Sequence, residues 1–245
     1  MIFRKKVKLL LIGVLSLLSL TSFGANEKEI IYNAYITDNM SIWKKTIDAM
    51  DAETNKTIAR EFELLNYEYG YIAWCVGKKK TDEANLYLNK GTQRITKLET
   101  YKKSLGLIYA YQSAFYGYQI GMNKIKAPFL GPKSIEVAKK SVTMNINNYF
   151  GYMQLGNIEY YMPPVFGGSK EKALDYYLRA KEIMDKRDNK NDWNYLNLIA
   201  VIGMTYQELN NYNKAEAYYK LALKQEPNFL WVSRDLYPKL IKTKK

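Results

Sequence analysis

The sequence predicts an all-α fold built from antiparallel helix pairs, and three observations lead to that prediction. Only six prolines occur in 245 residues, and the glycines fall mainly between apolar stretches. Within those stretches apolar residues recur at i, i+3, i+4 and i+7, the spacing of one helix face. A pattern of small, large and small residues also recurs along the chain, as expected where two helices approach closely.

The periodicity places helices along the whole chain, and no segment is interpreted as a strand. Asp38, Asn39, Thr81 and Ser169 precede apolar-periodic runs and are expected to cap them. Proline interrupts a helix interior, so the connections are expected to hold Pro128, Pro132, Pro163, Pro164 and Pro227. The expected helices are 27–37, 41–52, 55–77, 82–98, 102–122, 133–145, 147–161, 169–186, 192–209, 212–225 and 229–242.

The most regular segment runs from Leu196 to Phe229. Gly203 and Ala215 are expected at the closest approach of two antiparallel helices, with Tyr206 and Tyr219 filling the space beside them. Counted from Leu196, positions 4, 7, 8, 11, 20, 24, 27 and 32 of a 34-residue unit are Ile199, Ile202, Gly203, Tyr206, Ala215, Tyr219, Ala222 and Pro227. This pattern resembles the tetratricopeptide repeat (TPR).

Weaker copies of the second-helix signature lie upstream at irregular intervals. They are Ala173, Tyr177 and Ala180, then Ala84, Leu88 and Gly91, with Ala138 and Val142 as a doubtful fourth. The resemblance therefore implies degenerate repeats: a right-handed, TPR-like α-solenoid with a curved inner face, in which each pair depends on its neighbours.

The segment Pro163 to Gly168 reads Pro-Pro-Val-Phe-Gly-Gly. It resembles the Pro-x-x-Phe-Gly-Gly loop of small exported bacterial TPR proteins, some of which are similar to the T component associated with TRAP-type transporters. That resemblance implies a transporter component as one partner. From the residues alone, Gly167 and Gly168 permit positive φ before Ser169, and Phe166 is expected to pack back as a hydrophobic staple. An anion-binding loop is the alternative, although lysine and threonine in Walker spacing are missing.

The first residues have the layout of a secretory signal peptide. Arg4, Lys5, Lys6 and Lys8 precede a 15-residue apolar run from Leu9 to Phe23, which is shorter than the roughly 20 residues of a membrane-spanning helix. We expect cleavage after Gly24, giving an exported protein whose single helical domain is 25–245; an uncleaved anchor is the alternative. No cysteine lies near that point, which excludes the lipoprotein route. Cleavage lowers the net charge from +13 to +9, because it removes four of 37 basic residues and none of 24 acidic ones.

Several kinds of chemistry are excluded by composition. The chain has no histidine and one cysteine, Cys75, so a Ser-His-Asp triad, a Cys-His pair, a histidine-ligated zinc site and an internal disulfide cannot form. Carboxylate pairs such as Glu61 with Glu63 are interpreted as helix surface, and Cys75 beside Trp74 as core. No catalytic residue, metal site or cofactor is predicted.

Twenty-three tyrosines against eight phenylalanines suit a hydrated binding surface, because tyrosine joins an apolar ring to a polar tip. Positions 2, 5, 9 and 12 of a repeat's first helix face the concave side. Counting from Leu196 and from Tyr149 gives a partner-binding face of Asn197, Met204, Gln207, Phe150, Met153, Asn157 and Tyr160, with Ala200 beside them. The lysine and asparagine clamp with which some repeats of this family hold a carboxylate is missing.

The sequence therefore predicts a non-enzymatic exported scaffold that binds a peptide, a protein or a transporter component in its concave groove. The alternative is a helical carrier of a small solute, with a pocket lined by residues 109–118 and 149–161. An open groove would favour the scaffold and an enclosed pocket the carrier. The lysine clusters, including Lys78, Lys79 and Lys80, are interpreted as solvated surface, with an anionic envelope surface as the alternative contact. Nucleic acid is not an expected partner.

Overall fold

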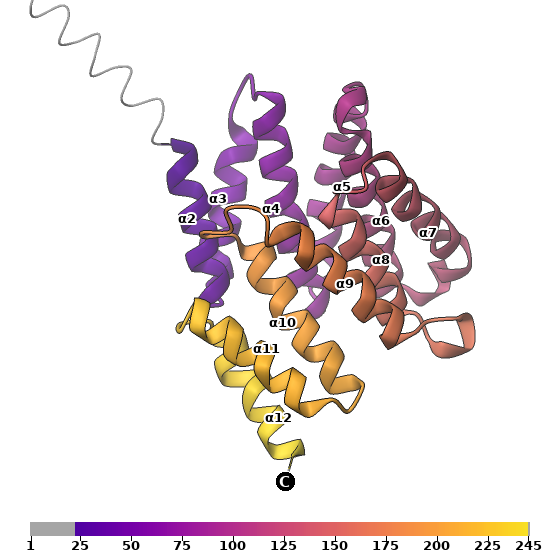
Figure 1. The fold of residues 1–245 in the computed structure, drawn as a ribbon. Helices are drawn as coiled ribbons and strands as arrows, with labels where there is room; N and C mark the ends of the chain where they lie inside the picture. The colour runs from indigo at the N-terminus through magenta and orange to yellow at the C-terminus, as the bar shows by residue number, and fades with distance from the viewer. Residues whose placement is uncertain (1–22, 245) are drawn as a thin grey trace, which may run out of the picture.

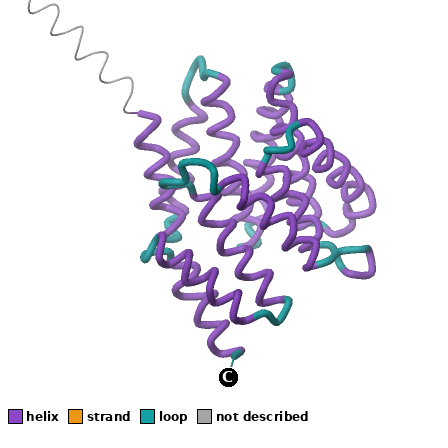
Figure 2. Tube along the Cα trace, in the orientation of Figure 1, coloured by secondary structure: helices purple, strands orange, loops and turns teal. Residues whose placement is uncertain are grey.

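The computed structural model describes residues 23–244, which form helices joined by short connections and no strand (Figures 1 and 2). Three 3₁₀ turns, η1 (Lys102–Ser104), η2 (Lys124–Lys126) and η3 (Pro164–Phe166), and a π-helical turn, η4 (Trp231–Leu236), accompany the α-helices. The α-helices are α2 (Phe23–Ile36), α3 (Met40–Ala52), α4 (Ile58–Gly77), α5 (Thr81–Leu98), α6 (Leu105–Met122), α7 (Ala127–Met144), α8 (Tyr149–Tyr161), α9 (Lys170–Met184), α10 (Trp193–Glu208), α11 (Tyr212–Gln225) and α12 (Tyr237–Thr243).

Successive helices pack as hairpins: α4 with α5, α6 with α7, α8 with α9, and α10 with α11. Neighbouring hairpins stack on one another through α4 and α6, α6 and α8, and α9 and α10. The predicted all-α stack of helix pairs is therefore confirmed. The four alanines of the small-residue pattern, Ala84, Ala138, Ala173 and Ala215, are all fully buried, because a larger side chain at these positions would separate the helices.

The prediction for residues 124–145 is wrong at its start. Helix α7 begins at Ala127 rather than near residue 133, so Pro128 and Pro132 lie inside the helix instead of in a connection. Pro128 occupies the first turn, where the backbone N–H has no partner within the helix, so proline is tolerated there. Pro132 lies only one turn further on and interrupts the hydrogen-bond ladder near its beginning.

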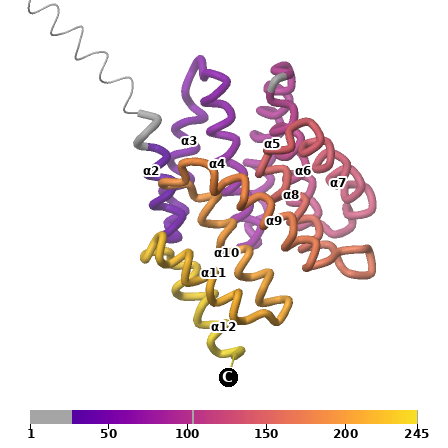
Figure 3. Tube along the Cα trace, viewed as in Figure 1, coloured from indigo at the N-terminus to yellow at the C-terminus, as the bar shows by residue number. Residues whose placement is uncertain are grey.

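The first described helix, α2, contacts α10 and the segment that follows α11, and this contact closes the stack on itself (Figure 3). An aromatic seam of Tyr35, Trp43, Trp193 and Phe229 forms this contact. The Trp43 and Trp193 ring centroids are 5.1 Å apart, and those of Tyr35 and Phe229 are 5.2 Å apart. Helix α4 completes the seam, since a Cβ on Gly70 would lie 2.6 Å from the Trp43 ring and 2.7 Å from that of Trp193. At the aromatic seam, the inner side of the stack is therefore filled by packed core side chains.

The predicted signal peptide, residues 1–24, falls almost wholly outside the described residues, so its cleavage stays a prediction. Among residues 23–244, no helix has the length and apolar character needed to cross a membrane. Cys75 is fully buried, as expected, and desolvation raises the pKa of its thiol to about 11.

Candidate functional site

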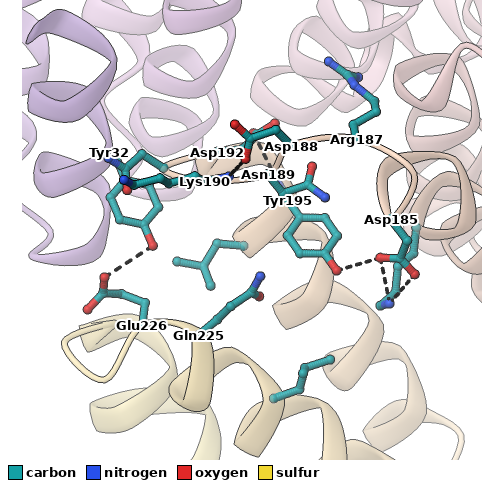
Figure 4. Close-up of a pocket in the computed structure, with 14 residues that line it drawn as sticks. Tyr32, Asp185, Arg187, Asp188, Asn189, Lys190, Asp192, Tyr195, Gln225 and Glu226 are labelled. Carbon is teal, nitrogen blue, oxygen red and sulfur yellow. Dashed lines mark hydrogen bonds and ion pairs between the residues drawn. The ribbon is translucent and has the colours of Figure 1, made fainter. Parts of the chain in front are cut away.

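A cavity of about 610 Å³ lies where α2 meets the α9–α10 connection and the end of α11 (Figure 4). We call it the closure cavity. Its walls are Tyr32 on α2, the connection from Asp185 to Asp192, the first turn of α10, and Leu221 to Glu226 at the end of α11. Its volume falls within the range of small-molecule sites in proteins, although its lining is more polar than is usual for them.

Asp192 shapes the cavity wall by capping α10. Its carboxylate accepts hydrogen bonds from the backbone N–H groups of Asn194 at 2.9 Å and Tyr195 at 3.2 Å. The preceding Asn191 has a φ of 53°, a left-handed conformation that asparagine adopts more readily than most residues. Desolvation raises the pKa of Asp192 above its ordinary value, although both N–H groups and Arg187 oppose that shift.

Tyr195 on α10 is tied to the end of α9. Its hydroxyl donates to Asp185 at 2.6 Å, and Lys181 donates to both oxygens of that carboxylate at 3.0 and 2.7 Å. Burial, followed by the Asp185 contacts, raises the pKa of Tyr195. The Asp185 carboxylate is thus largely satisfied by protein groups, and it serves to hold the wall in place.

Tyr32 on α2 and Glu226 at the end of α11 are linked across the cavity. The Tyr32 hydroxyl donates to the Glu226 carboxylate at 3.3 Å. Desolvation and then the charge of Glu226 raise the pKa of Tyr32 to about 12, so the phenol stays a hydrogen-bond donor at neutral pH.

Charges of both signs face the cavity. Asp188, Asp192 and Glu226 supply carboxylates, and the connection between α9 and α10 supplies the exposed cation Lys190. The Arg187 guanidinium lies over the Tyr149 ring at 4.9 Å and points away from the cavity (Figure 4). The Oδ1 atom of Asn189 is buried and has no hydrogen-bond partner among the described residues, while its Nδ2 donates to the Met184 carbonyl at 2.7 Å. This oxygen is therefore an unsatisfied buried acceptor within the cavity wall.

Two residues of the predicted partner-binding face are core residues instead. Phe150 is 1% exposed and Met153 is 2% exposed. The Phe150 ring packs against Tyr111 and Tyr69, at centroid distances of 4.5 and 4.9 Å. The prediction that Phe150 and Met153 line an accessible groove is wrong, because the space in front of α8 is filled by aromatic rings from α4 and α6.

The three amides of that face are half-buried and bind tyrosines of the protein itself. Asn197 accepts from the Tyr35 hydroxyl at 3.0 Å, across the contact between α2 and α10. Asn157 accepts from Tyr177 at 2.8 Å, and Gln207 from Tyr219 at 3.1 Å. These oxygens therefore connect helices. The Asn157 amide nitrogen also donates to Gln154 at 3.2 Å, which leaves the amide N–H groups of Gln207 as the groups to test for partner contact.

Tyr160 and Met204 are half-buried at the ends of α8 and α10. Lys170 lies over the Tyr160 ring at 3.5 Å, and the neighbouring Tyr161 ring is 4.9 Å from Tyr160 and 72% exposed. Residues 109–118 and 149–161 supply much of the core, which argues against the pocket expected between them. Phe166 is 74% exposed, so the expected staple is wrong, while Gly167 has the expected positive φ of 96°.

The closure cavity was not predicted from the sequence. Its walls come from residues up to 194 positions apart, such as Tyr32 and Glu226. The one local signal is the polar run from Asp185 to Asp192, which is long for a connection between paired helices. Among the described residues, no group of three or more Cys, Asp or Glu side chains is placed to hold a metal ion.

Comparisons with known proteins give one result that bears on the fold. No family model matches the chain, and no curated protein matches it in sequence. Among solved structures, the chain is similar to the HusA haemophore from Porphyromonas gingivalis, with a TM-score of 0.60 and 15% sequence identity. The likeness covers 77% of this chain and 94% of that one. At this identity, it shows a shared helical fold.

Proposed function

We propose that this chain is a non-catalytic binding protein and that its ligand occupies the closure cavity. The observation that carries the proposal is the solvent-open pocket of about 610 Å³ formed where α2 meets α10 and the end of α11. Its polar walls are held by hydrogen bonds between elements distant in sequence. A site built in this way is largely formed before the ligand arrives, which reduces the entropic cost of binding.

A compact ligand fits this structure better than a long peptide along the concave side. The aromatic seam and the rings around Phe150 fill the inner face where an extended chain would have to lie. This argument favours the small-ligand alternative over the open groove.

The charges define the class of ligand. Asp192 and Glu226 can receive an ammonium group, and Lys190 can receive a carboxylate. A zwitterion of modest size, such as a short peptide with free termini, satisfies both.

Calorimetry with the purified protein tests this proposal, using trialanine and the same peptide acetylated at its N-terminus or amidated at its C-terminus. We expect saturable binding of the free peptide and at least tenfold weaker binding of either blocked form. Glu226→Gln should weaken binding, whereas Glu136→Gln on the exposed face of α7 should not. Equal binding of free and blocked peptides, or no binding by any of them, would refute the zwitterion site.

A second candidate is a haem-type ligand, favoured by the likeness in fold to a haemophore. With no histidine in the chain, iron would be bound by tyrosine or methionine. The exposed Tyr161, beside Tyr160 at the end of α8, is the place to look. Haemin titration followed by absorbance separates the two candidates: a stoichiometric spectral change that Tyr161→Phe abolishes and Glu226→Gln leaves intact would favour haem.

We also propose that the protein is exported and that it belongs to the TPR family. Export rests on the basic and apolar run of residues 1–24. The TPR assignment is supported by a repeated contact in which a tyrosine ring covers a helical glycine, as Tyr177 covers Gly156 and Tyr219 covers Gly203. Intact-mass analysis of the protein from its host should give a chain that begins at Ala25; retention of Met1 in a membrane fraction would contradict export in cleaved form.

A further inference from the structure

Four large apolar side chains on two connections extend into solvent. Ile125 and Phe129, at the α6–α7 connection and the start of α7, are 79% and 73% exposed. Val165 and Phe166, on the connection between α8 and α9, are 85% and 74% exposed. We call these four residues the apolar edge. Such exposure of four apolar side chains is unfavourable in water and points to a surface that is covered in use.

The two connections lie on the same edge of the stack. Helices α6 and α8 contact one another, and their starts are tied together because the Asn148 side chain donates to the Gly106 carbonyl at 3.0 Å. Both helices are followed by an antiparallel partner, so their far ends and the connections after them also share an edge. The α8–α9 loop projects beyond the helices there (Figure 1). The α4–α5 turn joins this edge, since a Cβ on Gly121 of α6 would lie 3.3 Å from Val76 of α4.

Lysines surround the apolar edge. Lys124, Lys126 and Lys133 flank Ile125 and Phe129, and no acidic residue occurs from Met122 to Lys133. Lys170 and Lys172 follow Phe166, with Glu171 as the acidic residue between them. The α4–α5 turn adds the exposed Lys78, Lys79 and Lys80. Isolated apolar side chains on projecting loops, each with lysines beside it, match the chemistry of a lipid headgroup layer above an acyl layer.

We propose that the apolar edge docks on an anionic lipid bilayer, with the four apolar side chains inserted at the headgroup level and the lysines facing lipid phosphates. Charge complementarity supports this occupant, because cationic side chains near an anionic surface strengthen its binding. The α9–α10 connection, which lines the closure cavity, lies on the opposite edge. The cavity therefore stays open to solvent while the protein is docked.

The test compares the full chain and its variants on sedimented vesicles of phosphatidylcholine alone or with 30% phosphatidylglycerol. We expect the protein to bind the anionic vesicles. Val165→Ser combined with Phe166→Ser should weaken that binding about tenfold. Replacing Lys124, Lys126 and Lys133 together with glutamine should weaken it by a similar factor. The matched control is Ile146→Ser, a 64% exposed apolar residue on the opposite edge, which should bind like the wild type. Unchanged helical circular dichroism shows that each variant is folded.

Residues 1–24 are themselves apolar and basic and could also bind vesicles. A tryptophan placed at the apolar edge therefore reports membrane contact of that edge alone. Phe166→Trp should show quenching of its added fluorescence by brominated lipid in anionic vesicles, and Ile146→Trp should not. Equal quenching at the two positions would overturn the proposal. So would equal vesicle binding by the wild type and the Val165, Phe166 double variant. Loss of binding to a soluble protein, with vesicle binding unchanged, would assign the edge to a protein partner instead.

Discussion

The ring of Tyr219 lies directly over the backbone of Gly203. A Cβ added to Gly203 would be 2.6 Å from Cε1 and 2.8 Å from Cδ1 of that ring, and neither residue can move away because both are buried between α10 and α11. The same relationship joins Gly156 to Tyr177, where the distance would be 2.5 Å. Small residues therefore set the separation of the paired helices, as the sequence pattern predicted for Gly203.

Gly203→Ala should destabilise the protein by about 1 to 3 kcal/mol, because the Tyr219 ring has to be displaced in a close-packed core. The matched control is Gly117→Ala on α6, where an added Cβ meets nothing within 4 Å. Replacing an exposed helical glycine with alanine should stabilise by up to about 1 kcal/mol. Urea unfolding measures both. Equal stability of Gly203→Ala and the wild type would show that the contact is looser than the structure indicates.

Phe150→Ala should lower the free energy of unfolding by about 3 to 5 kcal/mol, because it removes a fully buried ring that contacts Tyr69 and Tyr111. Tyr161→Ala, eleven residues later on the same helix, should change it by about 0.5 kcal/mol or less, since Tyr161 is 72% exposed. Thermal unfolding compares the two variants. A much smaller loss of stability in Phe150→Ala would show that Phe150 lies on the accessible face rather than in the core.

The pairing of helices could be predicted because its determinants are local. Ala173 with Tyr177 and Ala215 with Tyr219 report helix contacts through spacings of a few residues, and these contacts form as predicted. Closure of the stack has no such signature. The hydrogen bond from Tyr35 to Asn197 joins residues 162 positions apart, and a repeat register counted within one helix pair cannot show which distant rings will fill its inner face. The site prediction was wrong at Phe150 and Met153 for this reason.

A buried ion network between α4 and α5 provides another test. Arg94 donates to Glu68 at 3.0 and 3.1 Å and also to Glu61 and Asp51, and Glu68 is only 1% exposed. Glu61 is 3% exposed, so its interpretation as helix surface is wrong. Desolvation raises the pKa of Glu68, although Arg94 opposes that shift. Arg94→Met should cost about 3 to 5 kcal/mol at neutral pH, because it leaves the buried Glu68 carboxylate without its cation. Glu61 keeps its ion pair with Lys97 and Asp51 its pair with Lys90.

The loss caused by Arg94→Met should shrink in acid. Without Arg94 the pKa of Glu68 should rise further than in the wild type. Protonation of Glu68 then stabilises the variant more than the wild type, so lowering the pH should recover part of the loss. Unfolding of the variant and the wild type between pH 4.5 and 7.5 measures this difference. A constant difference across that range would show that Arg94 acts through packing rather than by neutralising Glu68.

Asp192 both caps α10 and places a negative charge in the cavity wall, and Asp192→Asn separates these two roles. Asparagine caps a helix as well as aspartate does, so the hydrogen bonds to the N–H groups of Asn194 and Tyr195 should persist. Since desolvation raises the pKa of Asp192 in the fold, the wild type loses stability as pH rises from the unfolded pKa, about 3.9, through the raised value. The variant has no such loss. It should therefore match the wild type near pH 3 and melt at a higher temperature at pH 7.

The same substitution should weaken binding of a zwitterionic peptide in the closure cavity, because it removes one carboxylate that can receive the ammonium group. Asp192→Ala is the matched control: it removes the cap as well as the charge and should cost about 1 kcal/mol relative to Asp192→Asn. Calorimetry and thermal unfolding of both variants, at pH 3 and pH 7, distinguish the roles. If Asp192→Asn melts below the wild type at pH 7, the attraction between the carboxylate and the α10 N-terminus exceeds its desolvation, and Asp192 is then a structural anchor of the helix.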